Sequence, residues 1–235
     1  MATAQKTAAQ KFIETNVDFD KTVKIHGGET PFSPTPMKGV ERMMFERRGD
    51  EVAIRATSVV RYAPESYFEP HAHPGGEEFI VLEGTFQDNH GNYPKGYYVR
   101  NPVCSTHRPF SDDGCEIFVK LAQLPPEEGK EQFIIDMNTA EWKKDSNKSC
   151  KLHLWESDYE HTDAFMFDAG YESETQLFND VAEFFVIKGE VTVNGVSYPE
   201  RSWLRFAEGT PVTISSENGA TVYRKIGKGY ARKSL

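Results

Sequence analysis

Cysteine is scarce in this chain of 235 residues. The three cysteines, Cys104, Cys115 and Cys150, are odd in number and show no C-x-x-C spacing. This usage excludes a disulfide framework and a thiolate zinc site. The sequence therefore predicts reduced thiols, as in a cytoplasmic protein.

Long apolar runs and clusters of positive charge are also absent. No stretch approaches the ~18 apolar residues of a membrane span, and the opening MATAQKTAAQKF lacks the apolar region of a signal peptide. The 27 Lys and Arg are scattered, and 36 Asp and Glu give a net charge of -9. These features exclude membranes and nucleic acid as partners and leave a small-molecule substrate or ligand. A monomer and a homodimer are equally compatible with the sequence.

Short runs of Val, Ile, Phe and Tyr, each closed by Gly, Pro, Asn or Asp, dominate the chain after an irregular loop at 27–39. They include EVAIRATSVVRYAP, FIVLEGTFQ, YPKGYYVRNP and CEIFVKLAQL. Many short strands with regular turn signals are typical of an all-β sandwich or barrel. The proline-containing and charged segment LPPEEGKEQ at 124–132 predicts a linker.

The part of the chain after this linker repeats the part before it at an offset of 105 residues. EFIVLEGTF at 78–86 matches EFFVIKGEV at 183–191, and YPKGYYVR at 93–100 matches YPERSWLR at 198–205. Such self-similarity indicates two copies of one structural unit. We expect an N-terminal tail over 1–25, one barrel over 26–128 and a second over 129–235.

The first repeat contains EPHAHPGGEEFIVLEG, in which two histidines are followed by a turn and two glutamates. Alternate residues of a strand share a face, so His71 and His73 can reach one ion. Glu77 shares the parity of the expected core residues Phe79 and Val81, which favours it over its neighbour. The best candidate for a fourth ligand is His107. Imidazoles with a carboxylate suit Zn, Fe, Mn, Ni or Cu.

These residues also resemble a known family. HAHPGGEEFIVLEG is similar to the first motif of the cupins, and GNYPKGYYVRNPVCSTH to a variant of the second. More narrowly, residues 30–124 resemble the cupin half of ChrR-type proteins. The resemblance implies a bicupin of two tandem jelly-roll, or double-stranded β-helix, barrels. It also implies one divalent metal ion, with iron or zinc first and manganese or nickel next, on His71, His73, Glu77 and His107. The zinc-binding helical domain of the anti-sigma members has no counterpart here.

The second repeat lacks those ligands. At the 105-residue offset, the four positions become Gln176, Phe178, Ala182 and Val212. Because these side chains cannot hold a transition metal, the second barrel is expected to be metal-free. A scaffold role and an organic ligand in its interior both stay open.

The remaining histidines and Cys104 receive other interpretations. His26 and His90 fit loops or turns, and His161 lies in a charged stretch. His153 alternates with two leucines and is interpreted as a solvent-facing strand residue. Cys104 is expected to be a small buried apolar residue. Phe79, Val81, Tyr97 and Val99 are expected to line the barrel.

Three functions fit this reading. The favoured one is a dioxygenase in which the metal brings O2 and a chelating small substrate together. The second is a non-catalytic metal or redox sensor like the ChrR cupin. The third is a metal-dependent isomerase or hydrolase, for which Glu78, Tyr97 and Arg100 could not be assigned as acid or base.

Overall fold

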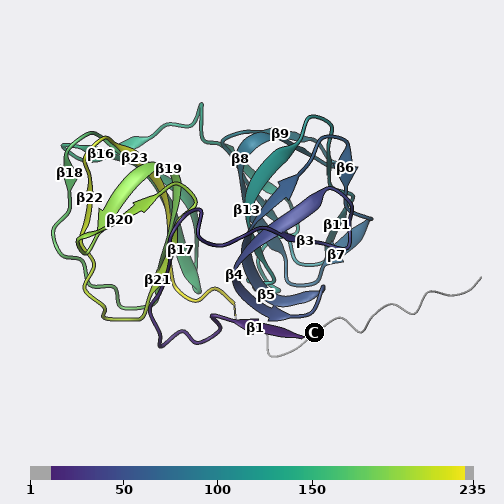
Figure 1. The fold of residues 1–235 in the computed structure, drawn as a ribbon, viewed down its shortest axis with the longest axis horizontal. Coiled ribbons are helices and arrows are strands. Elements are labelled where there is room, and N and C mark those ends of the chain that lie inside the picture. The colour runs from purple at the N-terminus through teal and green to yellow at the C-terminus, as the bar shows by residue number, and fades with distance from the viewer. Residues whose placement is uncertain (1–11, 231–235) are drawn as a thin grey trace, which may run out of the picture.

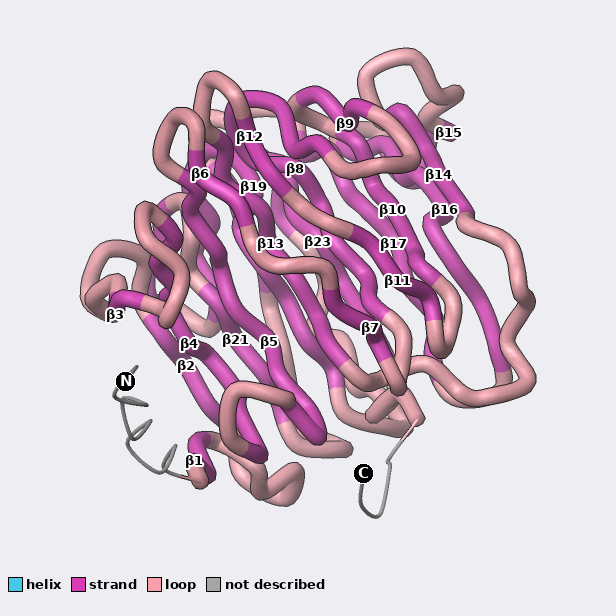
Figure 2. Tube along the Cα trace, turned by 90° about the vertical axis from the view of Figure 1, so that its right-hand side faces the viewer, coloured by secondary structure: helices cyan, strands magenta, loops and turns pink. Residues whose placement is uncertain are grey.

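The computed structural model describes residues 12–230, and all regular structure in this range is β-strand (Figure 2). Two barrels lie side by side, the first drawn in blue and teal and the second in green and yellow (Figure 1). The predicted all-β chain of two tandem barrels is thus confirmed. Within residues 12–230, no helix is long and apolar enough to cross a bilayer.

The first barrel is built on one large sheet and a two-stranded sheet. The main path of the large sheet runs β1 (Ile13–Thr15), β4 (Val40–Gly49), β5 (Ala53–Tyr62), β13 (Cys115–Leu121), β8 (Glu77–Gln87), β10 (Tyr97–Asn101) and β14 (Phe133–Asp136). Its short additions are β3 (Ser33–Pro34), β6 (Ser66–Tyr67), β9 (Asn92–Pro94) and β12 (Phe110–Ser111). The two-stranded sheet pairs β7 (His71–His73) with β11 (Ser105–His107).

The second barrel repeats this order. Its main path runs β15 (Lys143–Ser146), β16 (Ser149–Ser157), β17 (Glu160–Phe167), β23 (Ala220–Ile226), β19 (Ala182–Val193), β21 (Trp203–Phe206) and β2 (Val23–Ile25). Its additions are β18 (Tyr171–Glu172), β20 (Val196–Pro199) and β22 (Ile214–Ser216). The central strands β17, β23, β19 and β21 therefore occupy the places of β5, β13, β8 and β10.

Edge strands cross between the two barrels. β1 pairs with β4 of the first barrel, whereas β2 pairs with β21 of the second. In Figure 1 the purple N-terminal segment passes from one barrel to the other and back. β14, which follows the linker, pairs with β10 of the first barrel. Of the expected tail over 1–25, residues 1–11 lie outside the described residues, and residues 13–25 carry β1 and β2.

β8 is buried on both faces, which explains why FIVL is a continuous apolar run rather than an alternating one. Phe79 and Val81 face the core of the first barrel. Ile80 and Leu82 face a larger core that also contains residues of the second barrel. At its centre the rings of Phe118 and Phe185 stack with centroids 4.1 Å apart. The two barrels are therefore joined through a shared core.

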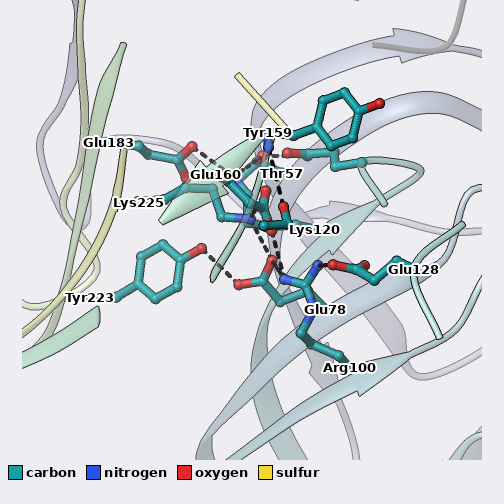
Figure 3. Close-up of polar contacts among 12 residues, drawn as sticks. Thr57, Glu78, Arg100, Lys120, Glu128, Tyr159, Glu160, Glu183, Tyr223 and Lys225 are labelled. Atoms are coloured by element: carbon teal, nitrogen blue, oxygen red, sulfur yellow. Dashed lines mark hydrogen bonds and ion pairs between the residues drawn. The ribbon is translucent and has the colours of Figure 1, made fainter. Parts of the chain in front are cut away.

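Charged side chains cross this apolar interface (Figure 3). Lys120 of β13 donates to both carboxylate oxygens of Glu183 of β19, at 2.6 and 2.7 Å. Lys120 also donates to Thr57 at 3.1 Å, and Trp203 donates to Glu183 at 2.8 Å. Both charged side chains are almost fully buried. A buried charge is tolerated only when it is paired and hydrogen-bonded, as it is here.

A second buried cluster surrounds Glu78 of β8. Lys225 of β23 donates to Glu78 at 2.6 Å and to Glu160 at 2.7 Å. Arg100 donates to the same two carboxylates, at 3.1 and 2.7 Å. Tyr223 adds a hydrogen bond to Glu78 at 2.8 Å. Each of the two carboxylates therefore has one cationic partner from the first barrel and one from the second.

The two clusters are related by the sequence repeat. Glu78 and Lys120 of the first barrel correspond, at 105 residues, to Glu183 and Lys225 of the second. The glutamate of each barrel forms an ion pair with the lysine of the other barrel. Reciprocal contacts of this kind are those of a two-fold symmetric dimer interface. The chain thus reproduces, in one polypeptide, the contact that two copies of a single barrel would make.

Lys120→Met is expected to lower the free energy of unfolding by about 3–5 kcal/mol, because it leaves the Glu183 carboxylate buried without its cation. Lys120→Met/Glu183→Leu should recover most of this loss, since no buried charge remains at the pair. Urea denaturation measures both effects. Lys95→Met is the control: Lys95 pairs with Glu83 at 2.7 Å, but both side chains are more than half exposed, and the loss should stay below about 1 kcal/mol. Equal losses for both single variants would contradict this account.

The same network predicts acid sensitivity. Burial alone would raise the pKa of the Glu78 carboxyl, but Lys225 and Arg100 lower that pKa to about 2. The pKa is thus lower in the folded chain than in the unfolded one. The stabilisation by Glu78 is complete above the unfolded pKa of 4.5 and is lost as the pH falls towards 2. Denaturation at a series of pH values should give a shallower pH slope for Glu78→Gln in this window. An unchanged slope would count against the ionised form of Glu78.

Candidate metal centre

The three histidines of the candidate site lie on a small antiparallel sheet. β7 and β11 pair with His71 opposite His107 and His73 opposite Ser105. His71 and His73 are separated by the exposed Ala72, so they share the face that points into the barrel. The register of this one pair of strands brings residues 71 and 107 together.

The turn after β7 delivers Glu77 to the same place. Gly76 lies in this turn with φ of 72°. A Cβ there would approach the Leu124 side chain to 2.7 Å and the Asn101 carbonyl oxygen to 3.1 Å. Only glycine fits both the backbone conformation and the space. β8 then starts at Glu77, and the next residue, Glu78, faces the barrel interface, as the alternation predicts.

The four predicted ligands are brought together. His71, His73 and His107 each offer a nitrogen within 4.8 Å of the others. The Nε2 atoms of His73 and His107 are 2.9 Å apart. Glu77 Oε2 lies 3.7 Å from Nε2 of His73 and 3.8 Å from that of His107. His73, Glu77 and His107 are buried and His71 is half-buried.

Hydrogen bonds from outside the cluster orient two of the imidazoles. Asp88 Oδ2 lies 2.9 Å from Nδ1 of His107. The carbonyl oxygen of Glu69 lies 2.7 Å from Nδ1 of His71. Both acceptors favour the tautomer with the proton on Nδ1, which leaves Nε2 free as a donor to a metal.

The carboxylate is held in a similar way. Asn101 donates to Glu77 Oε2 at 2.8 Å, and Gln132 donates to the Asn101 side chain at 2.7 Å. Neither these residues nor Asp88 was predicted from the sequence. Asp88 lies in the turn DNHG, and Asn101 ends the strand YYVRN, where polar residues are ordinary. No local pattern distinguishes them from other turn residues.

The pKa values of the cluster suit a cation. Burial lowers the pKa of His73 to about 4, so this imidazole is neutral at physiological pH. Burial acts against the ionised form of Glu77, but His73 and His107 together lower the pKa of the Glu77 carboxyl. Burial also opposes the charge on His107, while Glu77 and Asp88 raise its pKa. A bound cation would remove the need for that proton.

Three imidazoles and one carboxylate, oriented and partly desolvated, therefore fit a borderline divalent metal ion. The set suits Fe, Zn, Mn, Ni and Cu, and excludes the oxygen-only coordination that Mg and Ca prefer. Its oriented ring nitrogens are also typical of protein metal sites.

A cavity of about 300 Å³ opens at these residues. Its wall carries His71, His73, Glu77 and His107 together with apolar side chains of β5 and β13, including Val60, Ile117, Val119 and Leu121. Arg42 and Arg47 also line the cavity. The cavity has the mixed lining of a small-molecule site, with few polar groups in an apolar wall.

Other expectations have mixed outcomes. Phe79, Val81 and Val99 lie in the first barrel's core, with Tyr97 packed against it, as predicted. The expectation that Cys104 is buried is wrong: it is exposed. The cause is the turn before β11, in which Cys104 adopts φ of 65° and its N–H donates to the His73 carbonyl oxygen at 2.8 Å.

The second barrel has the equivalent backbone without the ligands. Gln176 and Val212 form an antiparallel bridge that corresponds to the pair of His71 with His107. Phe178 packs against the second barrel's core and Ala182 is buried within it. The alignment of the two repeats is therefore correct at the site itself.

A second cluster of histidines with a carboxylate, not predicted from the sequence, lies in the second barrel. His153 and His161, set aside separately, both contact Asp163, at 3.4 and 2.9 Å. His153 is exposed, which agrees with its interpretation as a solvent-facing strand residue. The pairing of β16 with β17 places it opposite Asp163. Arg224 also bonds Asp163, at 2.7 Å, so this carboxylate already has a cationic partner.

Comparisons with known proteins agree with the fold. Residues 20–125 match the family model of the ChrR cupin-like domain. No curated protein matches the chain by sequence.

Solved structures share the fold. A candidate dioxygenase from Nostoc punctiforme PCC 73102 is 13% identical, with a TM-score of 0.66 over 94% of this chain and 84% of that one. A nickel(II) complex of a bacterial pirin from Escherichia coli is 15% identical, with a TM-score of 0.65 over 89% and 100%. Salicylate 1,2-dioxygenase from Pseudoaminobacter salicylatoxidans, in adducts with gentisate, is 12% identical, with a TM-score of 0.56 over 74% and 68%. At these identities the likeness establishes the fold alone.

We expect protein purified anaerobically without a metal-affinity tag to carry about one equivalent of a divalent transition metal. His73→Ala should lose it, and Asp88→Asn should weaken metal affinity by about 10–100-fold because His107 loses its orienting acceptor. Elemental analysis and competition with a chelator measure these effects. His153→Ala is the matched control and should retain the metal. Metal kept by His73→Ala but lost by His153→Ala would move the centre to the second barrel.

Proposed function

We propose that the first barrel, which contains most of the residues 20–125 that match the ChrR cupin-like domain, is a mononuclear, non-haem metal dioxygenase. Its substrate is a small organic molecule with two oxygen donors that can chelate a metal. The observation that carries the proposal is the set of His71, His73, Glu77 and His107 at the wall of a cavity of about 300 Å³.

In this proposal the four side chains hold a ferrous ion, which supplies the redox chemistry with O2 that protein side chains lack. Asp88 and Asn101 keep His107 and Glu77 in position. Asp88 bonds Nδ1 of His107, the ring nitrogen away from the cluster, and Asn101 donates to Glu77 Oε2, the oxygen nearest the imidazoles. The reaction oxidises the substrate and reduces O2, and both oxygen atoms enter the product. No external reductant is needed.

The cavity selects the substrate. Its apolar wall of Val60, Ile117, Val119 and Leu121 excludes water from the reacting groups and favours a largely apolar body. Its volume lies at the small end of the range for ligand pockets. A β-dicarbonyl compound or a phenol with an adjacent carbonyl group satisfies both constraints. The likeness in fold to dioxygenases, one of them a salicylate dioxygenase, supports this choice of substrate class.

A sensor role is the second candidate, and the family match favours it. The matched residues, 20–125, cover the barrel with the histidines and little of the second barrel. In that case the metal responds to its surroundings without turnover. For the isomerase or hydrolase, no observation adds support, because Glu78, Tyr97 and Arg100 are absent from the described lining of the cavity.

The proposal is tested by loading metal-free protein with Fe(II) under anaerobic conditions and adding air with pentane-2,4-dione or salicylate. We expect O2 uptake that depends on the organic compound, with both atoms of labelled O2 recovered in the product by mass spectrometry. His71→Ala should abolish uptake through loss of the metal.

Val60→Phe tests the cavity separately from the metal. Position 60 corresponds to Phe165 of the second barrel, so the fold accommodates the larger ring. This variant should retain iron but lose at least 10-fold in O2 uptake, because the ring fills the substrate space. Stoichiometric zinc in the purified protein, with no O2 uptake by the iron form on either compound, would favour the sensor instead.

A further inference from the structure

The second barrel contains a cavity of its own, of about 200 Å³. Its wall consists of Asp145, Phe165, Phe167, Tyr171, Gln176, Phe184, Ile214, Val222 and Arg224. Most of these residues are aromatic or aliphatic, and they come from β15, β17, β19, β22, β23 and the segment around β18.

This cavity lies where the first barrel has its metal-lined cavity. At an offset of 105 residues, Phe165, Phe167, Gln176, Val222 and Arg224 correspond to Val60, Tyr62, His71, Ile117 and Val119. All five of the latter line the first cavity. The second barrel has therefore kept the cavity while losing the metal ligands, and it has gained an arginine at a position where the first barrel has valine.

Arg224 is held in a fixed orientation. Its Nη2 donates to Asp163 Oδ2 at 2.7 Å, and its guanidinium lies 4.4 Å from the centroid of the Phe165 ring. Asp163 is fully buried and is contacted by His161 at 2.9 Å. Because Asp163 and Phe165 already hold the guanidinium in the folded sheet, it does not need to be ordered when a ligand binds.

One buried donor of this guanidinium lacks a hydrogen bond among the described residues. Arg224 Nε is buried and has no hydrogen-bond partner among the described residues. A buried donor on a charged group without a partner costs free energy, which an acceptor in the cavity would restore. Gln176, at the position of His71, offers an amide on the same wall. A carboxylate is the group that matches a guanidinium edge in shape and charge.

We propose that the second barrel binds a small aromatic monocarboxylate, with its carboxylate on Arg224 and its ring among Phe165, Phe167 and Phe184. Asp145 on the same wall disfavours a second negative charge, which limits the ligand to one carboxylate. The small volume limits it to about one ring. The site needs no metal and is independent of the function proposed for the first barrel.

Benzoate is the probe for this site. Isothermal titration should be done on metal-free protein carrying His73→Ala, so that the first barrel cannot bind benzoate through a metal. We expect saturable binding of one benzoate per chain, a raised melting temperature, and at least 10-fold weaker binding of the neutral isostere benzamide.

Two variants locate the binding. Arg224→Val introduces the residue of the first barrel at this position and should weaken benzoate binding at least 10-fold. Ile214→Phe fills the cavity and leaves the ion pair of Arg224 with Asp163 in place. It should also weaken benzoate binding at least 10-fold. This second variant keeps the test decisive if Arg224→Val does not fold. The proposal is wrong if benzoate does not bind, if benzamide binds equally well, or if the folded variants bind benzoate as the parent does.

Discussion

The buried ionic contact between the barrels is the constraint on which the rest of the structure depends. Lys120 and Glu183, and in reverse Glu78 and Lys225, are removed from water within a shared apolar core. Four charges in such a place are stable only if both barrels are present and correctly aligned. The reciprocal ion pairs favour one alignment of the two barrels. The stability of each barrel therefore depends on the position of the other.

This contact also orients the two cavities, because strands that form the contact also line a cavity. On β8, Glu77 faces the histidines and Glu78 faces the interface. On β23, Arg224 faces the second cavity and Lys225 joins the interface network. Strand alternation assigns neighbouring residues to opposite faces. The candidate metal and ligand residues therefore lie on strands that are also bonded to the other barrel, and sites on strands are positioned more precisely than sites on loops.

The two cavities illustrate how one unit can diverge. In the first barrel, three imidazoles and Glu77 surround a place suited to a cation. In the second, the equivalent cavity is lined by Arg224, whose guanidinium is paired with the buried Asp163 and keeps a buried donor without a partner among the described residues. Both arrangements place groups that can bind an oxygen-containing ligand in an apolar space: a candidate metal set in the first barrel and a guanidinium in the second. We propose redox chemistry with O2 for the first and binding of a carboxylate for the second.

The sequence by itself determined the all-β class and the two repeats, because strand alternation, turn residues and repeat spacing are local or nearly local signals. Strand alternation also grouped His71, His73 and Glu77, whereas the complete set with His107 was implied by the resemblance to the cupins. The sequence also contained a signal of the interface, since Glu78 and Lys120 recur as Glu183 and Lys225 in strands that are otherwise apolar. Only the tertiary structure decided which residues support the ligands, that β1 and β2 join different barrels, and that Arg224 lines a cavity beside Asp163. These contacts join residues far apart in the chain, and polar residues in turns and edge strands look alike in sequence until pairing places them.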